Sequence, residues 1–224
     1  MWHMKTYGQY CPISRSAELL GDRWTIHIIR DLLTGTSRFN ELISGNPGLS
    51  RALLSRRLQQ LKRAGVIERD GGGTYSLTPS GRDLEPVMMG LATWGARWTF
   101  GEPEPEELDP DLLMWWLHRR LDPNKLPSPR FTIQINFADH PKHYWIVVDH
   151  DSSLCLADPR FDVDVTVRTD RSTLYRTYLG HVSLKEAHRS GRIELIGTRS
   201  SVRLFINAFE PSPVASIVHA EAPQ

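Results

Sequence analysis

The chain has 224 residues, 40% hydrophobic and 24% charged, and a net charge of +1 at pH 7. This composition is ordinary for a soluble globular protein and excludes wholesale disorder, while the length suits two domains. No apolar run approaches the roughly 20 residues of a membrane span, and residues 1–10 lack the apolar stretch of a secretory signal. We therefore expect a cytoplasmic protein without membrane insertion.

Charge is unevenly distributed along the chain. Residues 1–100 hold 13 basic and 8 acidic residues, a net charge of +5, whereas residues 101–224 hold 14 and 18, a net charge of −4. A basic half beside an acidic half favours one polyanion-binding module. The Pro- and Glu-rich segment 101–110 cannot bury a core and is interpreted as a linker. The sequence therefore predicts domains at 1–100 and 111–210 and a C-terminal tail at 211–224.

Apolar residues of the first domain recur with the period of a helix. Asp22 is expected to cap one helix, and a short helix follows at 38–44. Asn46-Pro47-Gly48 predicts a turn, after which Ser50 caps a helix over 51–64. Two helices joined by a tight turn are the core of a helix-turn-helix.

The second of these helices has a polar face that suits base reading. Leu54, Leu58 and Leu61 recur at i, i+4 and i+7 and are expected to face inward. On the other side, arginine offers a bidentate donor pair to guanine and alanine contacts a thymine methyl. The candidates for base contacts are Ser50, Arg51, Ala52, Ser55, Arg56 and Gln59. The alternative is that these basic residues only form a solvated helix face.

Two short runs of β-forming residues follow the helix-turn-helix. Residues 66–69 and 74–77 surround an Asp70-Gly71 turn, which predicts a β-hairpin wing. The three glycines at 71–73 lead into a strand, and no Lys-Ser or Lys-Thr follows them. We therefore exclude a phosphate-binding loop at this point.

Thr78-Pro79 opens a longer helix, in which Pro86 is expected to bend the helix or delay its start. An apolar stripe runs along it at three- and four-residue steps. Such a stripe also suits intrachain core, but a two-fold operator needs a two-fold protein, which favours a dimer contact. The dimerisation candidates are Leu84, Val87, Leu91, Trp94 and Trp98.

Several motifs of the first domain occur together. They are Cys11-Pro12-Ile13, Leu20-Gly21-Asp22-Arg23-Trp24-Thr25, Arg38-Phe39-Asn40-Glu41-Leu42, Leu49-Ser50, Leu54-Ser55, Arg57-Leu58, Leu61, Ala64-Gly65-Val66-Ile67, Tyr75-Ser76-Leu77-Thr78-Pro79-Ser80-Gly81 and Trp94-Gly95. Over about residues 8–100 the chain thereby resembles the HxlR family of bacterial regulators. The resemblance implies a winged-helix homodimer that inserts the helix after Ser50 into the major groove of double-stranded DNA. The candidates for phosphate contacts are Arg23, Arg38, Arg57 and Arg69.

Two cysteines are too few for a disulfide framework, and Cys11 and Cys155 lie too far apart for a Cys-x-x-Cys motif. Cys11 stands where the HxlR family commonly keeps a cysteine, and in some members that thiol senses oxidants or electrophiles. The resemblance makes Cys11 a redox candidate. The alternative is that it is a small buried hydrophobe, because reactivity needs exposure and a lowered pKa.

The second domain has α+β character. Its order of elements fits an antiparallel sheet covered on one side by helices. We expect helices at 110–121, 172–179, 184–190 and from Ser200, and strands at 131–137, 144–148, 162–167 and 193–196.

The stretch 163–203 also carries a resemblance. Its residues Asp170, Leu174, Tyr178-Leu179-Gly180, Leu184-Lys185-Glu186-Ala187, Ser190-Gly191-Arg192-Ile193 and Ile196-Gly197 are similar to those of the sterol-carrier-protein-like (sterol carrier type two) domain. This resemblance implies an apolar tunnel between sheet and helices that binds lipidic molecules. The candidates to line it are Trp115, Trp116, Trp145, Leu156, Val165, Leu174, Tyr178 and Leu195. The alternative is that these residues are plain core.

The sequence thus predicts a homodimeric transcription regulator that binds a pseudo-palindromic operator and responds to an apolar small molecule. The alternatives are a redox or electrophile sensor acting through Cys11, a lipid-binding protein with a DNA-binding appendage, and a protein-interaction module, which the arginines oppose. The chain lacks His-Glu-x-x-His, Gly-x-Ser-x-Gly and dinucleotide glycine motifs, so we expect no enzyme and no cofactor. His140 and His143 lack an evident third ligand, so we expect no metal site.

Overall fold

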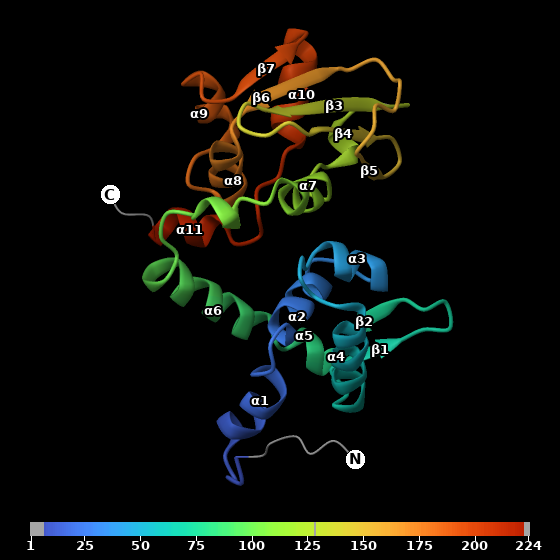
Figure 1. Cartoon of the computed structure of the whole chain (residues 1–224), viewed down its shortest axis with the longest axis vertical. Coiled ribbons are helices and arrows are strands. Elements are labelled where there is room, and N and C mark those ends of the chain that lie inside the picture. The colour runs from blue at the N-terminus through green and yellow to red at the C-terminus, as the bar shows by residue number, and fades with distance from the viewer. Residues whose placement is uncertain (1–6, 128, 222–224) are drawn as a thin grey trace. The chain divides into compact units, whose positions relative to one another are not determined.

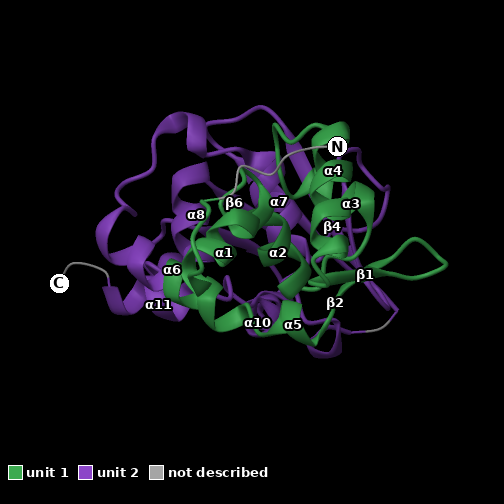
Figure 2. Ribbon diagram, turned by 90° about the horizontal axis from the view of Figure 1, so that it is seen from below, with its two compact units in different colours: residues 1–91 green, residues 92–224 purple. Residues whose placement is uncertain are grey.

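The computed structural model describes residues 7–127 and 129–221 (Figure 1). Residues 1–6 of the predicted first domain and 222–224 of the predicted tail lie outside the described residues. The chain divides into two compact units, residues 1–91 and residues 92–224 (Figure 2). Helices and strands both contribute, which confirms the α+β class. Among the described helices, none has the length and apolarity needed to cross a membrane.

Unit 1, residues 1–91, contains the predicted helix-turn-helix and wing. Its elements are α1 (Pro12–Leu20), α2 (Thr25–Leu33), α3 (Phe39–Ser44), α4 (Arg51–Arg63), β1 (Ile67–Arg69), β2 (Tyr75–Leu77), α5 (Pro79–Arg82) and the beginning of α6 (Glu85–Trp98). The two strands pair antiparallel, with Ile67 opposite Leu77. Pro86 is the second residue of α6, so the predicted delay in the start of the long helix is confirmed.

The start of α2 differs from the prediction. The helix begins at Thr25, and its N-cap residue Trp24 has a left-handed backbone with φ 77°. The carboxylate of Asp22 instead binds the guanidinium of Arg57. The predicted capping role of Asp22 is therefore wrong, because a long-range ion pair occupies the side chain.

The helices of unit 1 close around one apolar core. The predicted inward face of α4 is confirmed, because Leu54, Leu58 and Leu61 are all buried. They pack with Ile28, Ile29, Leu32, Leu42, Leu49, Val66, Ile67 and Leu77. This burial is the main term that holds α4 in place and leaves its opposite face to solvent.

A buried amide fixes the turn between α3 and α4. The Nδ2 atom of Asn46 donates to Oδ2 of Asp31 at 2.6 Å and to the carbonyl of Leu42 at 2.8 Å. Burial raises the pKa of Asp31, while Arg30 and the amide of Asn46 act in the opposite direction. Asn46 thus ties the turn to both α2 and α3, which sets where α4 begins.

Unit 2, residues 92–224, consists of a sheet with helices. After the end of α6 come η1 (Pro105–Glu107), α7 (Pro110–His118), η2 (Pro123–Lys125), β3 (Phe131–Phe137), β4 (His143–Val148), β5 (Ser152–Cys155), β6 (Val165–Thr169), α8 (Arg171–Leu179), α9 (Leu184–Arg189), β7 (Glu194–Gly197), α10 (Arg199–Ala208) and α11 (Ala215–Glu221). The sheet order is β5-β4-β3-β6-β7. Residues 211–224, predicted as a tail, include α11, whose Ala215 and Val218 are buried.

The sheet is mixed, which corrects the predicted antiparallel sheet. Strands β3 and β6 pair in parallel, whereas the other three pairs are antiparallel. After the meander β3-β4-β5, the segment 156–164 carries the chain back past the first strand. Because β6 then runs in the direction of β3, it pairs in parallel, and alternation of apolar residues cannot reveal strand direction.

One face of this sheet forms the core of unit 2. Ile133 lies opposite Ile146 on β4 and Val165 on β6, and Ile135 lies opposite Tyr144. These side chains pack with apolar residues of the helices, namely Leu113, Met114, Leu117, Leu174, Tyr175, Tyr178, Leu184, Ala187 and Phe205. Successive strand residues point to opposite faces, so Gln134 and its partner Trp145 lie on the other side of the sheet.

Candidate nucleic-acid interface

The predicted base-contacting residues lie together on one face of α4. Ser50 caps the helix, its side chain accepting a hydrogen bond from the backbone N–H of Leu53 at 3.2 Å. The remaining candidates follow at helical spacing on the side opposite the leucines. Ser55 is half-buried, and the exposed members are Ser50, Arg51, Ala52, Arg56 and Gln59. This arrangement presents mixed donors and acceptors to a ligand that approaches the N-terminal half of α4.

Asn40 on α3 belongs to this surface and was missed by the sequence analysis. Nη1 of Arg51 donates to Oδ1 of Asn40 at 2.9 Å, and the same guanidinium lies over the ring of Phe39, 5.8 Å from its centroid. Asn40 is exposed, so it adds a polar side chain to this surface beside Arg51. Only the folded turn between α3 and α4 reveals this neighbour, because 11 residues separate the two in sequence.

Three predicted phosphate-contacting arginines are exposed. Arg23 precedes α2 and lies over the ring of Trp24, with 5.3 Å between guanidinium and centroid. Arg38 is the N-cap residue of α3, and Arg69 ends β1, where it lies over the ring of Tyr75 at 5.3 Å. Aromatic contacts of this kind restrain long cationic side chains without neutralising them.

Arg57 is the exception among the predicted phosphate contacts. Its side chain is buried, with 6% of the residue exposed. Its guanidinium donates to the carbonyl of Arg23 at 3.1 Å and to Oε1 of Gln60 at 2.7 Å, and it binds Asp22. The predicted phosphate role of Arg57 is therefore wrong, because its donors are used inside unit 1.

The wing is fixed at both its base and its tip. The backbone N–H of Tyr75 donates to the carbonyl of Ser37 at 2.8 Å, which joins β2 to the segment before α3. At the tip, the N–H of Thr74 donates to Oδ1 of Asp70 at 2.8 Å, and Gly73 has φ +85°. The hairpin therefore holds Arg69 in a defined position next to the helix-turn-helix.

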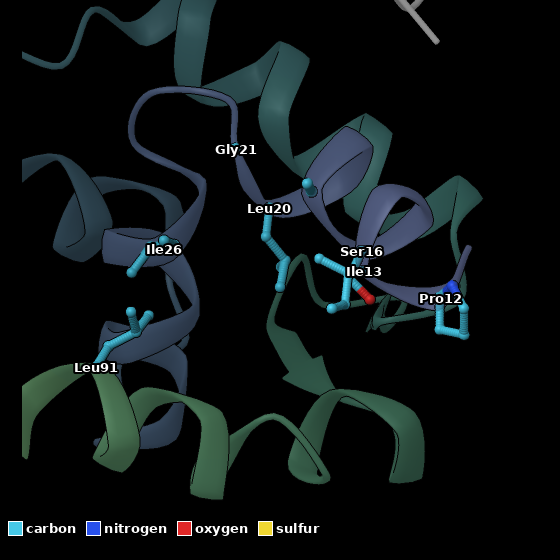
Figure 3. Close-up of a pocket in the computed structure, with 8 residues that line it drawn as sticks. Pro12, Ile13, Ser16, Leu20, Gly21, Ile26 and Leu91 are labelled. Carbon is cyan, nitrogen blue, oxygen red and sulfur yellow. The ribbon is translucent and has the colours of Figure 1, made fainter. Parts of the chain in front are cut away.

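The predicted dimerisation stripe is largely exposed. Val87, Leu91, Trp94 and Trp98 of α6 are between 45% and 68% exposed, whereas Leu84 packs against the core of unit 1. Leu91 and Ile26 also line an apolar groove of about 430 Å³ against α1 (Figure 3). The α1 side of the groove is formed by Pro12, Ile13, Ser16, Ala17, Leu20 and Gly21.

Cys11 is the N-cap residue of α1 and is partly exposed. The backbone N–H groups of Ser14 and Ile13 lower the pKa of its thiol, although the sulfur forms no capping hydrogen bond of normal geometry. Amides at the start of a helix stabilise a thiolate in the same way as other anions.

The eight predicted pocket residues of the second domain do not line one cavity. Val165, Leu174, Tyr178 and Leu195 are buried in the core, and Trp116 stacks on Tyr178 with centroids 6.0 Å apart. The other three lie elsewhere: Trp145 is on the opposite face of the sheet, Leu156 is 66% exposed, and Trp115 contacts His118 and Arg119. The predicted pocket is wrong for Trp145 and Leu156, because strand alternation and exposure separate them from the core. Trp115, half-buried on α7, is not among the residues that pack in that core.

Comparison with known proteins also divides the chain into two segments. Residues 19–102 match the family model of the HxlR-like helix-turn-helix, and residues 105–215 match that of the alkyl sulfatase C-terminal region. The match of the second segment leaves its predicted sterol-carrier-like identity unconfirmed.

Individual relatives align with the first segment. The chain is 36% identical over 97 residues to an uncharacterized HTH-type transcriptional regulator, sll1512, of Synechocystis sp., a match that covers 41% of this chain and 72% of the relative. It is 34% identical over 97 residues to the uncharacterized HTH-type transcriptional regulator YvaP of Bacillus subtilis, covering 40% and 90% of the two chains. The solved structure of quinone-bound YodB from B. subtilis has 32% identity and a TM-score of 0.37, and covers 39% of this chain and 99% of that chain.

Proposed function

Because the chain belongs to the HxlR family of helix-turn-helix transcriptional regulators, we propose that it acts in the cytoplasm as a homodimer on a pseudo-palindromic operator. In this proposal α4 enters the major groove and the wing lies beside it. The exposed polar face of α4, with Arg51 supported by Asn40, is the observation that carries the proposal.

Base readout is assigned to the exposed candidates on α4 and to Asn40. Arginine forms bidentate hydrogen bonds with guanine, and asparagine forms them with adenine. Phosphate contacts are assigned to Arg23, Arg38 and Arg69, whose cationic ends are exposed on the same unit. Such contacts fix the position of the protein on the duplex, while the base contacts select the sequence.

Self-association is assigned to the apolar stripe of α6 and the groove beside α1. Exposed large apolar side chains in a row, next to an apolar groove, are characteristic of an interaction surface. A second copy supplies both partners at once, because in a two-fold interface the stripe of each subunit meets the same surface of the other. Two recognition helices would then address half-sites about 10 bp apart.

The test is a footprint of the purified protein on genomic DNA, followed by gel-shift titration with the site found. Replacing Arg51 or Arg56 with alanine is expected to cost about 1–3 kcal/mol at the cognate site and to relax specificity there. Arg63→Ala, at the exposed C-terminal end of the same helix, is the matched control and is expected to have a smaller effect. Equal isotherms for wild type, Arg51→Ala and Arg56→Ala would refute the role of α4.

Unit 2 is proposed to bind a small-molecule effector and to have no enzymatic role. An effector alters operator binding only if it binds the DNA-competent and DNA-incompetent states with different affinities. The test is operator titration with and without apolar and amphiphilic metabolites. Unchanged operator affinity across such a panel would contradict regulation through unit 2.

Thiol sensing by Cys11 is a second candidate function. It is favoured by the partial exposure of Cys11 and by the first-turn amides of α1, which lower the pKa of the thiol. Oxidant- or electrophile-dependent release of DNA is expected to vanish in Cys11→Ser and to persist in Cys155→Ser. Release that persists unchanged in Cys11→Ser would eliminate this role.

A further inference from the structure

Unit 2 has a groove on a side of its fold that the sequence analysis did not assign. It lies between α9, β7 and α10, elements that Figure 1 shows in orange and red, and has a volume of about 630 Å³. The apolar residues that line it are Leu195, Val202 and Ile206. Val202 and Ile206 are partly buried against the core of the unit, so they form an apolar strip that remains accessible to a ligand.

Positive charge lines the rest of this groove. Its wall includes the cationic side chains of Lys185, Arg189, Arg199 and Arg203, together with His188 and Asn207. The lysine and the three arginines are exposed. Four cationic side chains therefore surround one apolar strip, in a half of the chain whose net charge is −4.

Nearby carboxylates do not neutralise the four cations. Within residues 7–127 and 129–221, no ion pair joins Lys185, Arg189, Arg199 or Arg203 to an acidic side chain. The carboxylate of Glu186 is bound to the N–H and hydroxyl of Ser183 at 3.0 and 2.7 Å. The other acidic residue on these elements, Glu194, lies 3.6 Å from Arg168. The groove thus keeps a positive field directed at its contents.

We propose that this groove binds an anionic amphiphile, a molecule with an aliphatic chain and a carboxylate, sulfate or phosphate head. The inference deepens the effector role proposed for unit 2 and rests on it. The strip of Leu195, Val202 and Ile206 takes the chain, and Arg199 and Arg203 take the head through charge-assisted, bidentate hydrogen bonds. The volume falls within the range of about 300–1,000 Å³ typical of small-molecule sites.

The two halves of the groove select this ligand class together. A neutral apolar molecule would leave four cations without a counter-charge, and a free inorganic anion would leave the apolar strip exposed to water. A molecule that carries both parts satisfies both halves, because apolar burial contributes about 25 cal/mol per Å² and the ion pair adds to it.

The test is isothermal titration of the full chain with ten-carbon probes kept below their micellar concentrations. Decyl sulfate, decyl phosphate and decanoate are expected to bind one molecule per subunit. Decanol and inorganic sulfate are expected to bind at least about tenfold more weakly, a difference of about 1.4 kcal/mol or more. Decanol binding as tightly as decyl sulfate, or inorganic sulfate doing so, would overturn the proposal.

Variants locate the site. The double substitution Arg199→Gln and Arg203→Gln is expected to weaken decyl sulfate binding at least about tenfold. The control is the double substitution Arg130→Gln and Arg160→Gln, at two exposed residues outside the groove. It removes the same charge and is expected to leave binding within about twofold. Thermal unfolding of each variant verifies that it is folded. Unchanged binding in the Arg199 and Arg203 variant, or equal loss in the control, would overturn the site.

The same titrations separate this inference from the DNA-binding role. They contain no DNA, so amphiphile binding by a protein that prefers no genomic duplex would contradict the regulator proposal and leave the groove intact. Operator binding by a protein that ignores all three anionic probes would contradict the groove and leave the DNA-binding role intact.

Discussion

Arg57, on the buried side of α4, binds the carboxylate of Asp22 in the segment before α2. The same guanidinium donates to the carbonyl of Arg23 at 3.1 Å. A helix that exposes Arg51 and Arg56 thus uses its third arginine to hold itself against the loop that precedes α2.

Arg57→Ala is expected to destabilise unit 1 rather than to weaken phosphate binding. The substitution removes the donor of the Arg23 carbonyl and leaves Asp22 with the 3.4 Å hydrogen bond from Nε2 of Gln60, and breaking a buried pair costs about 3–5 kcal/mol. Because Asp22 is 43% exposed and can be solvated, we expect a cost below that range, about 2–3 kcal/mol. Urea unfolding followed by circular dichroism measures it.

Arg63→Ala is the control for that experiment, because it removes an exposed arginine from the end of the same helix. It is expected to change the free energy of unfolding by less than about 0.5 kcal/mol. Equal stability of Arg57→Ala and wild type would show that the ion pair contributes nothing to the fold.

Alanine substitutions at three glycines distinguish the stability cost of a left-handed backbone from that of a steric clash. Gly65 follows α4 with φ +71° and open space around it, so Gly65→Ala is expected to cost about 1–2 kcal/mol. Gly180 has φ +91°, and a Cβ there would lie 2.5 Å from the carbonyl oxygen of Ala215. Gly180→Ala is therefore expected to cost more than Gly65→Ala, by about 1–3 kcal/mol.

Gly71→Ala completes this series as the neutral member, because a Cβ at Gly71 meets no atom within 4 Å and φ is not left-handed. It is expected to change stability by less than about 0.5 kcal/mol. Thermal unfolding of the three variants ranks them, and a Gly65→Ala variant as stable as Gly71→Ala would contradict the backbone argument.

Local patterns in the sequence predicted most of the elements. The strand at 131–137 has the bounds of β3, and the leucines of α4 are buried as their spacing predicts. The helical period and the capping residue Ser50 depend only on neighbours within a turn. For the same reason, the spacing of the buried leucines also predicted which side of α4 is exposed.

Features that depend on distant residues were beyond those patterns. The ion pair between Asp22 and Arg57 spans 35 residues, and neither residue type reveals its partner in sequence. The parallel pairing of β3 with β6 depends on the path of the connecting segment. The groove in unit 2 draws on α9, β7 and α10 at once, so its cationic lining emerges only when the three elements pack.

Salt dependence of DNA binding distinguishes the exposed arginines from one another. Arg38→Gln is expected to weaken binding to all duplexes alike and to reduce the slope of log K against log salt by about 1, because the phosphate contact proposed for Arg38 is lost. Arg51→Ala is expected to lower the preference for the cognate site instead. Fluorescence anisotropy over a range of salt concentrations measures both, and equal selectivity losses for the two variants would contradict the division of roles.

Cys11 is expected to react at lower pH than an ordinary thiol. The amides of Ser14 and Ile13 lower its pKa, so a larger fraction is thiolate at neutral pH, and only the thiolate is alkylated. The rate of iodoacetamide labelling should therefore reach its half-maximum at a lower pH than that of N-acetylcysteine labelled in the same buffer. Peptide mass spectrometry follows Cys11 alone, and a half-maximum at or above that pH would contradict the effect of the first-turn amides.

Leu91→Glu is expected to dissociate the proposed homodimer. Leu91 is 46% exposed on α6 and lines the apolar groove beside α1, so burying it against a second copy would place the new carboxylate in an apolar contact, at a cost of several kcal/mol. Sedimentation equilibrium should show a shift from dimer to monomer, with cognate DNA affinity falling in parallel.

Leu156→Glu, which adds the same charge at a side chain 66% exposed in unit 2, is the matched control and is expected to remain dimeric. If Leu91→Glu remained dimeric, self-association would lie elsewhere, because a charged side chain cannot be accommodated in a closely packed apolar interface. A monomeric wild type would contradict self-association itself.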